Sequence, residues 1–348
     1  MVMIMLPTIG ITQGDPAGIG AEVIVKALAL KEVRSICTPV VIGDRAAVSD
    51  ALRMTGLKLR IHICEKPADA LESDDVINLM DLALLEDGFE YKKISAAAGD
   101  ASFRYIRRAI ELALAGEIKA VVTAPISKEA LHMAGFKYAG HTEIFAELTG
   151  TKDYAMLLTS GSLRVIHVST HVSLAQACKR ATRERVGKVI RLGLEACRQM
   201  GVENPRIAVA GLNPHSSENG LFGTEEASDI IPAIEEAKGA GINVFGPLPA
   251  DTVFVRAAAG EFDMVVAMYH DQGHIPVKLL GFKVGEGAGN YSQVSGVNAT
   301  VGLPIIRTSV DHGTAFDRAG EGRANEGSMV EAIEMAVQMT RKATGGGA

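Results

Sequence analysis

Three short runs of apolar and β-branched residues in this chain each end in a histidine, which constrains both the fold and the chemistry. The runs lie within residues 163–171, 206–215 and 264–270. Such runs are typical of strands buried in an α/β sheet. Ligands of open α/β sheets bind at the carboxyl ends of the strands, where these histidines stand. The pattern therefore predicts an α/β fold with a polar site at one edge of the sheet.

The histidines at the three run ends are candidate metal ligands. They are His171, His215 and His270. Three neutral imidazoles, with positions left open for substrate or water, suit Zn²⁺, Co²⁺, Mn²⁺ or a similar Lewis acid. Their spacing is too long for a local metal motif, so a shared site requires the strand ends to meet in space. The alternative is three unrelated structural histidines.

The length and composition of the chain are typical of a soluble α/β enzyme. With 348 residues, 37 glycines and 47% hydrophobic residues, the chain has room for two domains and suits a glycine-turned α/β architecture. The net charge of −6 predicts no nucleic-acid partner and no membrane partner. The four cysteines lack CxxC spacing and indicate free thiols. Because residues 1–6 resemble neither a signal peptide nor a membrane span, we expect a cytoplasmic location.

Two turns are candidates for anion binding. Residues 14–20, Gly-Asp-Pro-Ala-Gly-Ile-Gly, join a predicted strand to a helix, with a glycine spacing unlike GxGxxG or a P-loop. Residues 140–143, Gly-His-Thr-Glu, open a helix predicted over residues 144–148, where side-chain and backbone donors can hold a phosphate. An ordinary turn and a capped helix with a solvated histidine are the respective alternatives.

Other segments predict structure more than chemistry. Ser127 is expected to cap a helix over residues 128–133, and Asp251 either caps a helix or lines a site. Residues 281–300 are rich in Gly, Ser and Asn and read as a long loop, which in a compact domain is often a lid or an interface arm. From residue 327 the pattern predicts one helix.

Six motifs spread in order over nearly the whole chain resemble one family. They are residues 14–20, 140–143, 211–215, 249–252, 268–273 and 306–315. Together they resemble the 4-hydroxythreonine-4-phosphate dehydrogenase family, which is similar in fold to the isocitrate and isopropylmalate dehydrogenases. The resemblance implies two α/β domains with the active-site cleft between them, and a homodimer with a shared active site.

The resemblance also implies a domain division and site residues. Residues 1–125 plus 303–348 would form a discontinuous first domain with a nucleotide-binding loop near 312–325, and residues 126–302 a second domain carrying most site residues and the dimer interface. The metal would be held by His171, His215 and His270, one of them from the partner chain. The implied substrate contacts are His141, Thr142, Lys278, Asn298 and Arg307. The implied cofactor contacts are Gly313, Thr314 and Asn325.

The implied reaction is the NAD-dependent oxidation of a 3-hydroxy group on a phosphorylated four-carbon acid, followed by decarboxylation. One divalent ion (Zn, Co, Mg or Mn) would assist both steps. Lys278 is a catalytic candidate. Asp251 and Asp271 are candidates for proton transfer, or alternatively orient a ligand histidine.

The choice of substrate depends on which branch of the family the chain resembles more closely. Residues 152–156, 165–171 and 274–282 look more like the branch that converts 4-phospho-D-threonate or 4-phospho-D-erythronate to dihydroxyacetone phosphate. The alternative substrate is 4-hydroxy-L-threonine 4-phosphate, on the route to pyridoxal phosphate. A non-redox metal-dependent hydrolase or lyase would also use such histidines and aspartates, but would not need NAD. A protein that only binds phosphosugars would need neither a metal nor an acid/base.

One departure from the family pattern falls before Asn298. Residues 283–296 intervene between the Gly-Phe at 281–282 and the Val-Asn-Ala-Thr motif at 297–300, whereas most relatives have only a few residues there. We hypothesise that this extra loop is a lid or a dimer arm that alters substrate choice. Deleting it without effect on activity or dimerisation would contradict the hypothesis.

Overall fold

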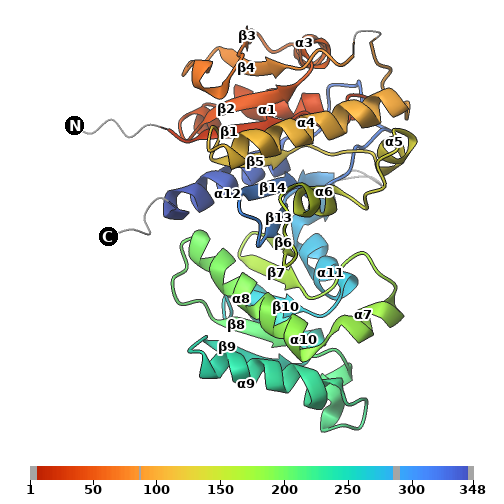
Figure 1. Cartoon of the computed structure of the whole chain (residues 1–348), viewed down its shortest axis with the longest axis vertical. Helices are drawn as coiled ribbons and strands as arrows, with labels where there is room; N and C mark the ends of the chain where they lie inside the picture. Colours follow the sequence, from red (N-terminus) through yellow and green to blue (C-terminus); the bar gives the residue numbers. More distant parts are fainter. Residues whose placement is uncertain (1–5, 86–87, 285–290, 344–348) are drawn as a thin grey trace, which may run out of the picture. The chain divides into compact units, whose positions relative to one another are not determined.

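The computed structural model describes residues 6–85, 88–284 and 291–343, which form two compact α/β units (Figure 1). Unit 1 contains the chain up to Thr151 and the segment Leu303–Thr340. Unit 2 contains Lys152–Gly302 and the end of the chain from Arg341. Unit 1 is therefore discontinuous. The observed division differs from the sequence-based one at residues 126–151, which group with unit 1 instead of the second domain.

Unit 1 is built on parallel strands in the order β3-β4-β2-β1-β5-β14. Its strands are β1 (Thr8–Thr12), β2 (Thr38–Gly43), β3 (Arg60–Ile63), β4 (Val76–Asp81), β5 (Ala120–Thr123) and β14 (Ile306–Val310). Its helices are α1 (Gly20–Ala29), α2 (Lys31–Arg34), α3 (Arg45–Thr55), α4 (Ala96–Leu114), α5 (Lys128–Met133) and α6 (His141–Leu148), with a 3₁₀ turn at Pro67–Asp69. The last helix, α12, spans Gly327–Ala343.

Residues 126–151 belong to unit 1 because α5 and α6 pack against α4. A Cβ added to Gly99 of α4 would lie 2.0 Å from the carbonyl oxygen of Ala130, so α5 sits directly on that glycine. Phe145 of α6 is fully buried in the same core as Tyr105 of α4. The predicted cap of α5 is confirmed, since the Ser127 side chain accepts a hydrogen bond from the backbone N–H of Ala130 at 3.2 Å.

Unit 2 is built on strands in the order β13-β6-β7-β10-β8-β9. β7, β10, β8 and β9 are parallel, and β6 is antiparallel to both of its neighbours. The strands are β6 (Ala155–Ser160), β7 (Leu163–His167), β8 (Ile207–Ala210), β9 (Val244–Leu248), β10 (Met264–Ala267), β11 (Phe282–Val284), β12 (Tyr291–Val294) and β13 (Val297–Val301). The helices are α7 (Leu174–Arg180), α8 (Arg183–Gln199), α9 (Ile231–Gly239), α10 (Ala250–Ala258) and α11 (His270–Gly281), with an irregular turn at Pro214–Glu218 and a π-helical segment at Glu226–Ile230 before α9.

The core of unit 2 explains the apolar runs. All residues of β8 and β10 are buried, because α8 covers these strands on one side and α10 and α11 pack on the other (Figure 1). Val265 of β10 pairs with Val165 of β7 and Ala208 of β8, so β10 lies between the other two strands. The three predicted strands are therefore neighbours in one sheet.

The prediction of a long loop over residues 281–300 is wrong for the part that the structure describes. β11 and β12 form an antiparallel hairpin, and β13 pairs antiparallel with β6. Val297, Ala299 and Val301 alternate with more polar residues, which suits a strand with one face in the core. The Gly, Ser and Asn content of residues 281–300 predicted a loop, whereas the short alternation at residues 297–301 is the pattern that marks the strand. Of the proposed extra loop 283–296, residues 285–290 lie outside the described residues.

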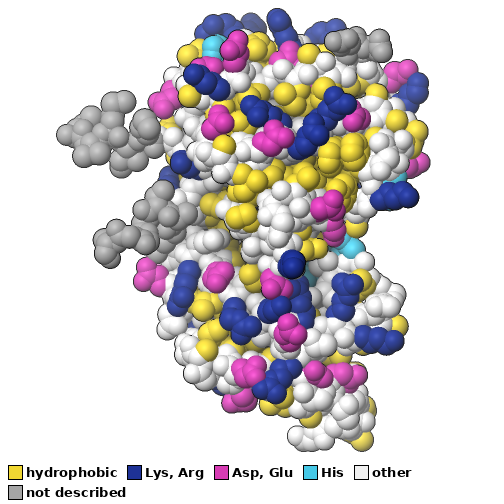
Figure 2. Space-filling view, viewed as in Figure 1, with side chains coloured by type: hydrophobic (Ala, Val, Ile, Leu, Met, Phe, Trp, Pro, Cys, Tyr) yellow, Lys and Arg dark blue, Asp and Glu magenta, His cyan; other side chains and the backbone are white. Residues whose placement is uncertain are grey.

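The surface shows no concentration of one charge on the face seen in Figure 2, where Lys and Arg side chains are interspersed with Asp and Glu. On this face there is no basic stripe of the kind that follows a nucleic-acid backbone. Among the described helices, none is both long and apolar enough to cross a bilayer.

Candidate functional site

The three predicted metal-ligand histidines follow three adjacent parallel strands of unit 2. His171 lies in the loop after β7, His270 is the first residue of the helix after β10, and His215 lies in the turn after β8. Because carboxyl ends of neighbouring parallel strands share one edge, the fold places all three in the same region of unit 2. Each strand ends earlier than its histidine, since β7 stops at His167 and β10 at Ala267.

His270 and His171 have the geometry of a partial metal site. Their ring centres lie 5.8 Å apart, and His270 Nδ1 bonds Asp271 Oδ1 at 2.7 Å. A tetrahedral ion at about 2.0–2.1 Å from two imidazole nitrogens holds the ring centres roughly 5 Å apart. A carboxylate on Nδ1 fixes the ring and its tautomer and leaves Nε2 available as a ligand. These residues therefore fit a divalent ion.

Two polar residues that the sequence analysis did not single out hold the strand ends together. Gln272 is buried, accepts from the backbone N–H of Met268 at 2.7 Å and donates to the carbonyl of Gly211 at 2.8 Å. Ser169 donates to the carbonyl of Met268 at 2.9 Å. The loops that carry the three histidines are thus fixed to one another. In the sequence, the amide residue Gln272 two positions after His270 was the feature that could have indicated this role.

His215 stands in an unusual backbone segment. Residues 215–219 all have positive φ, from 44° to 66°. Non-glycine residues seldom adopt this conformation, and it concentrates at functional sites. Buried Glu226 anchors the start of the turn by accepting from the backbone N–H groups of Leu212 and Asn213 at 2.8 and 2.7 Å. Across the described ranges, no three His, Cys, Asp or Glu side chains converge on one point, so His215 does not complete a three-ligand group with His171 and His270.

A pocket of about 490 Å³ lies beside His171 and His270. Its walls come from the loop and helix after β7 and from the start of α11, and they include Thr170, Ser173, Tyr269 and Asp271. A space of this size accepts a small organic substrate. The two closest metal-ligand candidates therefore line a cavity instead of being enclosed in the core.

Two further histidines extend inward from His270. The ring of His274 stacks on that of His270 at 3.6 Å between centres, and it lies 4.8 Å from the ring of His167. Burial lowers the pKa of His167 to about 4 and that of His274 to about 3, so both imidazoles are neutral at pH 7. His167 Nδ1 lies 3.1 Å from the carbonyl oxygen of Met156, which identifies that nitrogen as the one bearing hydrogen.

We expect His167 to make unit 2 sensitive to acid. The unfolded chain takes up a proton near pH 6.5 and the folded chain only near pH 4, so stability falls as the pH drops through this window. A tenfold change in proton affinity is worth about 1.4 kcal/mol, so the loss from His167 is on the order of 3 kcal/mol at pH 4. His167→Asn keeps a donor for Met156 and should reduce the loss of stability on acidification, while His274 still contributes to that loss. Urea unfolding at pH 7 and pH 4.5 measures this, and equal losses in both proteins would contradict it.

The predicted phosphate contacts Arg307, His141 and Thr142 lie in unit 1. Arg307, on β14, is 2% exposed, donates to Thr123 Oγ1 at 2.8 Å and lies 5.6 Å from the centre of the Phe145 ring. His141 and Thr142 begin α6, and burial, together with the charge of Arg307, lowers the pKa of His141 well below its usual value. Burial lowers the pKa of Arg307 to about 9, opposed by the nearby Glu143. A guanidinium, a neutral imidazole and a helix N-terminus suit a phosphate.

The remaining predicted substrate and catalytic residues lie in unit 2. Lys278 belongs to α11, the helix that begins at His270, and its ammonium group lies 4.7 Å from the centre of the Phe282 ring. Asn298 is on β13, opposite Leu158 of β6. Asp251 is exposed in the first turn of α10. Asp271 is also exposed, and its bond to His270 favours the orienting role that the sequence analysis left open.

The predicted cofactor loop lies in unit 1, beside the glycine-rich turn at residues 14–20. The carbonyl of Thr314 accepts from the backbone N–H of Ile19 at 3.1 Å. A Cβ at Gly18 would lie 3.0 Å from that carbonyl oxygen, so glycine allows the two segments to touch. Gly313 precedes this contact, and Asn325 Oδ1 accepts from the backbone N–H of Gly327 at 2.9 Å, next to the start of α12.

Comparisons with known proteins show similarity over nearly the whole chain. Residues 35–336 match the family described as pyridoxal phosphate biosynthetic protein PdxA. The protein named D-threonate 4-phosphate dehydrogenase from Cupriavidus necator is 50% identical over 340 residues, covering 97% of this chain and 99% of that protein. A protein of the same name from Pectobacterium atrosepticum is 48% identical over 338 residues, covering 96% and 100%.

A solved structure gives the same result. The crystal structure described as a 4-hydroxythreonine-4-phosphate dehydrogenase from Burkholderia phymatum matches this fold with a TM-score of 0.81 at 49% identity. The match covers 96% of this chain and 98% of that one. Relatives at this level of identity therefore carry two different substrate names.

Proposed function

We propose, because this chain belongs to the PdxA family and its relatives are dehydrogenases, that it oxidises and decarboxylates a four-carbon 3-hydroxy acid phosphorylated at C4. The preferred substrate is 4-phospho-D-threonate, with 4-phospho-D-erythronate as its close analogue. The observation that carries the proposal is the His171–His270 pair at adjacent strand ends, with Asp271 holding the second nitrogen of His270. A non-redox hydrolase has no comparable support, since the relatives are named dehydrogenases.

The proposed reaction has two steps, oxidation at C3 and decarboxylation, and residues of this chain would hold the metal ion that assists them. When bound, a divalent ion would polarise the C3 hydroxyl and the carboxylate, and NAD⁺ would accept the hydride from C3. His171 and His270 would hold the ion, with His215 as the third ligand across a dimer. Loss of hydride and the hydroxyl proton leaves a 3-keto acid. The C1–C2 bond then breaks, CO₂ leaves, and protonation at C2 gives dihydroxyacetone phosphate.

Lys278 and Asp251 are the residues that would donate and accept protons during the reaction. Asp271 is engaged by His270 and acts through that ring, so it is a positioning residue. Lys278 is on the same helix as His270 and presents an ammonium group beside Phe282. Arg307, His141 and Thr142 would bind the phosphate, and Asn298 would contact the substrate. Gly313, Thr314 and Asn325 would contact NAD.

We further propose that the protein is a homodimer and that α11 lies in the interface. Ile275, Leu279 and Leu280 on this helix are 64%, 79% and 49% exposed. Large apolar side chains gathered on one exposed helix mark an interaction surface. The same helix carries His270 and Lys278, so a partner covering it would lie close to the candidate site.

Leu279→Glu should therefore convert a dimer to a monomer and abolish activity, because a charge would be buried in an apolar contact. Size-exclusion chromatography with light scattering gives the mass. The matched control is Leu114→Glu, a comparable exposed leucine at the end of α4, which should stay dimeric. A wild-type monomer, or a dimeric Leu279→Glu protein, would exclude this interface.

The test of the proposed reaction is NADH formation with purified protein and added Zn²⁺, Co²⁺, Mn²⁺ or Mg²⁺. 4-Phospho-D-threonate, 4-phospho-D-erythronate and 4-hydroxy-L-threonine 4-phosphate are compared in parallel, and CO₂ release is measured with each. We expect the highest kcat/KM with 4-phospho-D-threonate. Preference for 4-hydroxy-L-threonine 4-phosphate, the compound in the name of the Burkholderia structure, would instead support a role in pyridoxal phosphate biosynthesis, as in the family description. No NADH with any combination would overturn the redox proposal.

A further inference from the structure

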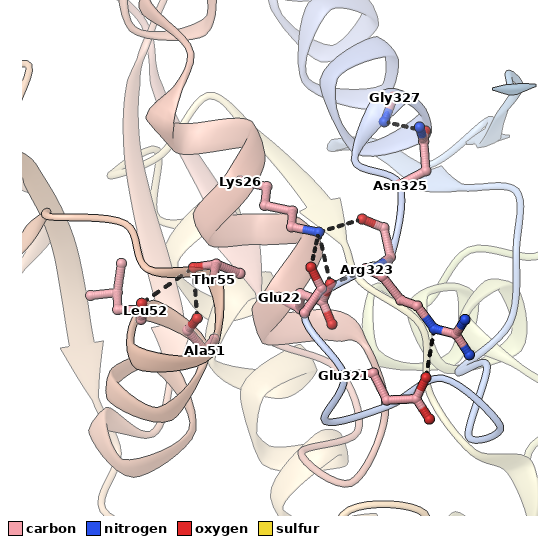
Figure 3. Close-up of polar contacts among 11 residues, drawn as sticks. Glu22, Lys26, Ala51, Leu52, Thr55, Glu321, Arg323, Asn325 and Gly327 are labelled. Atoms are coloured by element: carbon pink, nitrogen blue, oxygen red, sulfur yellow. Dashed lines mark hydrogen bonds and ion pairs between the residues drawn. The ribbon is translucent and has the colours of Figure 1, made fainter. Parts of the chain in front are cut away.

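Two charged residues on α1 bind the backbone of the predicted cofactor loop. Lys26 Nζ donates to the carbonyl oxygens of Gly322 and Ala324 at 2.8 and 2.7 Å, and to Glu22 Oε1 at 2.8 Å. Glu22 Oε1 also accepts from the backbone N–H of Ala324 at 2.6 Å. Figure 3 shows both side chains reaching from α1 to the loop segment that carries Arg323. One helix turn thus holds a short stretch of loop through its main chain.

The loop depends on side-chain contacts from outside because it has no regular backbone hydrogen bonding of the kind found in a helix or a sheet. Between β14 and α12, residues 311–326 form turns and bends without helix or strand. Besides local turn bonds such as that from the Arg318 N–H to the Ala315 carbonyl, the loop has other long-range contacts. They include the Thr314 carbonyl with the N–H of Ile19, and Lys92 Nζ with the carbonyl of Asp317 at 3.0 Å. Gly320, with φ 81°, passes so close to the Tyr91 ring that a Cβ would lie 2.9 Å from it. The loop shape is therefore set by its neighbours.

The burial of the pair indicates what it does. The Glu22 side chain is 2% exposed and that of Lys26 is 19% exposed. A buried ion pair is a poor device for stability alone, because well-packed apolar side chains often serve as well or better. Apolar side chains cannot bind two carbonyls and an N–H group of a neighbouring loop, whereas an ammonium and a carboxylate can. The pair is therefore suited to fixing the loop backbone.

We propose that Glu22 and Lys26 are positioning residues that hold the cofactor loop in its binding shape before NAD arrives. This inference rests on the proposed role of residues 312–325 in binding NAD. Asn325 follows Ala324 directly, so fixing the Ala324 N–H and carbonyl also fixes the backbone that presents Asn325. A loop ordered in advance does not lose conformational entropy when the cofactor binds.

The test separates NAD binding from the rest of catalysis. Lys26→Met keeps the length of the side chain and removes its three donors. We expect the KM for NAD to rise at least tenfold, while kcat and the KM for the phosphorylated acid change less than twofold. Lys26→Arg retains donors and should recover part of the loss, and Glu22→Gln should resemble Lys26→Met. The control is Lys188→Met, which removes a lysine paired with Asp153 and Glu184 in unit 2 and should leave every constant unchanged.

Amide hydrogen exchange without NAD tests the clamp independently of the reaction. Peptides covering residues 318–327 should exchange at least tenfold faster in Lys26→Met than in wild type, while peptides from β1 and β5 keep their rates. Unchanged exchange, or equal losses in both KM values, would overturn the proposal. Faster exchange in a protein whose wild type neither binds NAD nor forms NADH would confirm the clamp and refute the cofactor role of the loop.

Discussion

His270→Ala should lower kcat/KM by more than about 1000-fold and abolish stoichiometric metal binding, because it removes a proposed metal ligand and leaves Asp271 without its hydrogen-bond partner. Asp271→Asn keeps the ring in place and should weaken metal affinity by about 10–100-fold, the usual effect of losing such a support. Metal content by mass spectrometry and NADH formation are measured on the same samples. His132→Ala is the control, since His132 is exposed in unit 1 and its ring bonds the Tyr138 carbonyl, away from the candidate metal ligands in unit 2. Full activity of metal-free His270→Ala protein would refute the assignment.

Arg307→Met should reduce kcat/KM for the phosphorylated acid by about 100-fold or more, mostly through KM, because losing a buried charged hydrogen-bond partner costs about 2–5 kcal/mol. The KM for NAD should change little. Arg307→Lys keeps the charge but loses the planar fork, so it should fall in between.

The decisive comparison for Arg307 uses D-threonate without its phosphate. Wild type should prefer the phosphorylated acid strongly, and Arg307→Met should lose most of that preference. If the variant discriminated as well as wild type, Arg307 would not bind the phosphate. Arg307→Met leaves Thr123 Oγ1 without this donor and removes the positive charge near Glu143, so circular dichroism and urea unfolding of the variant must accompany the kinetics to separate a binding defect from unfolding.

The parts of the fold that could be predicted from the sequence are those that depend on residues close together in the chain. β8 and β10 were predictable because every residue of these runs is apolar, and the histidines after them marked the sheet edge. The Ser127 cap was predictable because a serine three residues before the bonded N–H is a short-range signal.

The parts that the sequence did not reveal depend on distant contacts. α11 contains Gly273 and Pro276, both unfavourable in helices, yet Gly273 is required because a Cβ there would lie 2.3 Å from His167 Nε2. The bonds of Gln272 to Gly211 and of Lys26 to the cofactor loop join residues far apart in the chain. The run of positive φ angles at residues 215–219 could not be predicted because none of these residues is a glycine.

The discontinuity of unit 1 sets the order in which the two units can be completed during synthesis. β5 can pair with β14 only after residues 306–310 have been synthesised. Likewise, α1 can bind the loop only after residues 322–324 have been synthesised. Unit 2 has received all of its sheet-forming residues by Val301. The unit that opens the chain is therefore the last to be supplied with its full set of residues, and until then the edge of β5 that pairs with β14 lacks that strand.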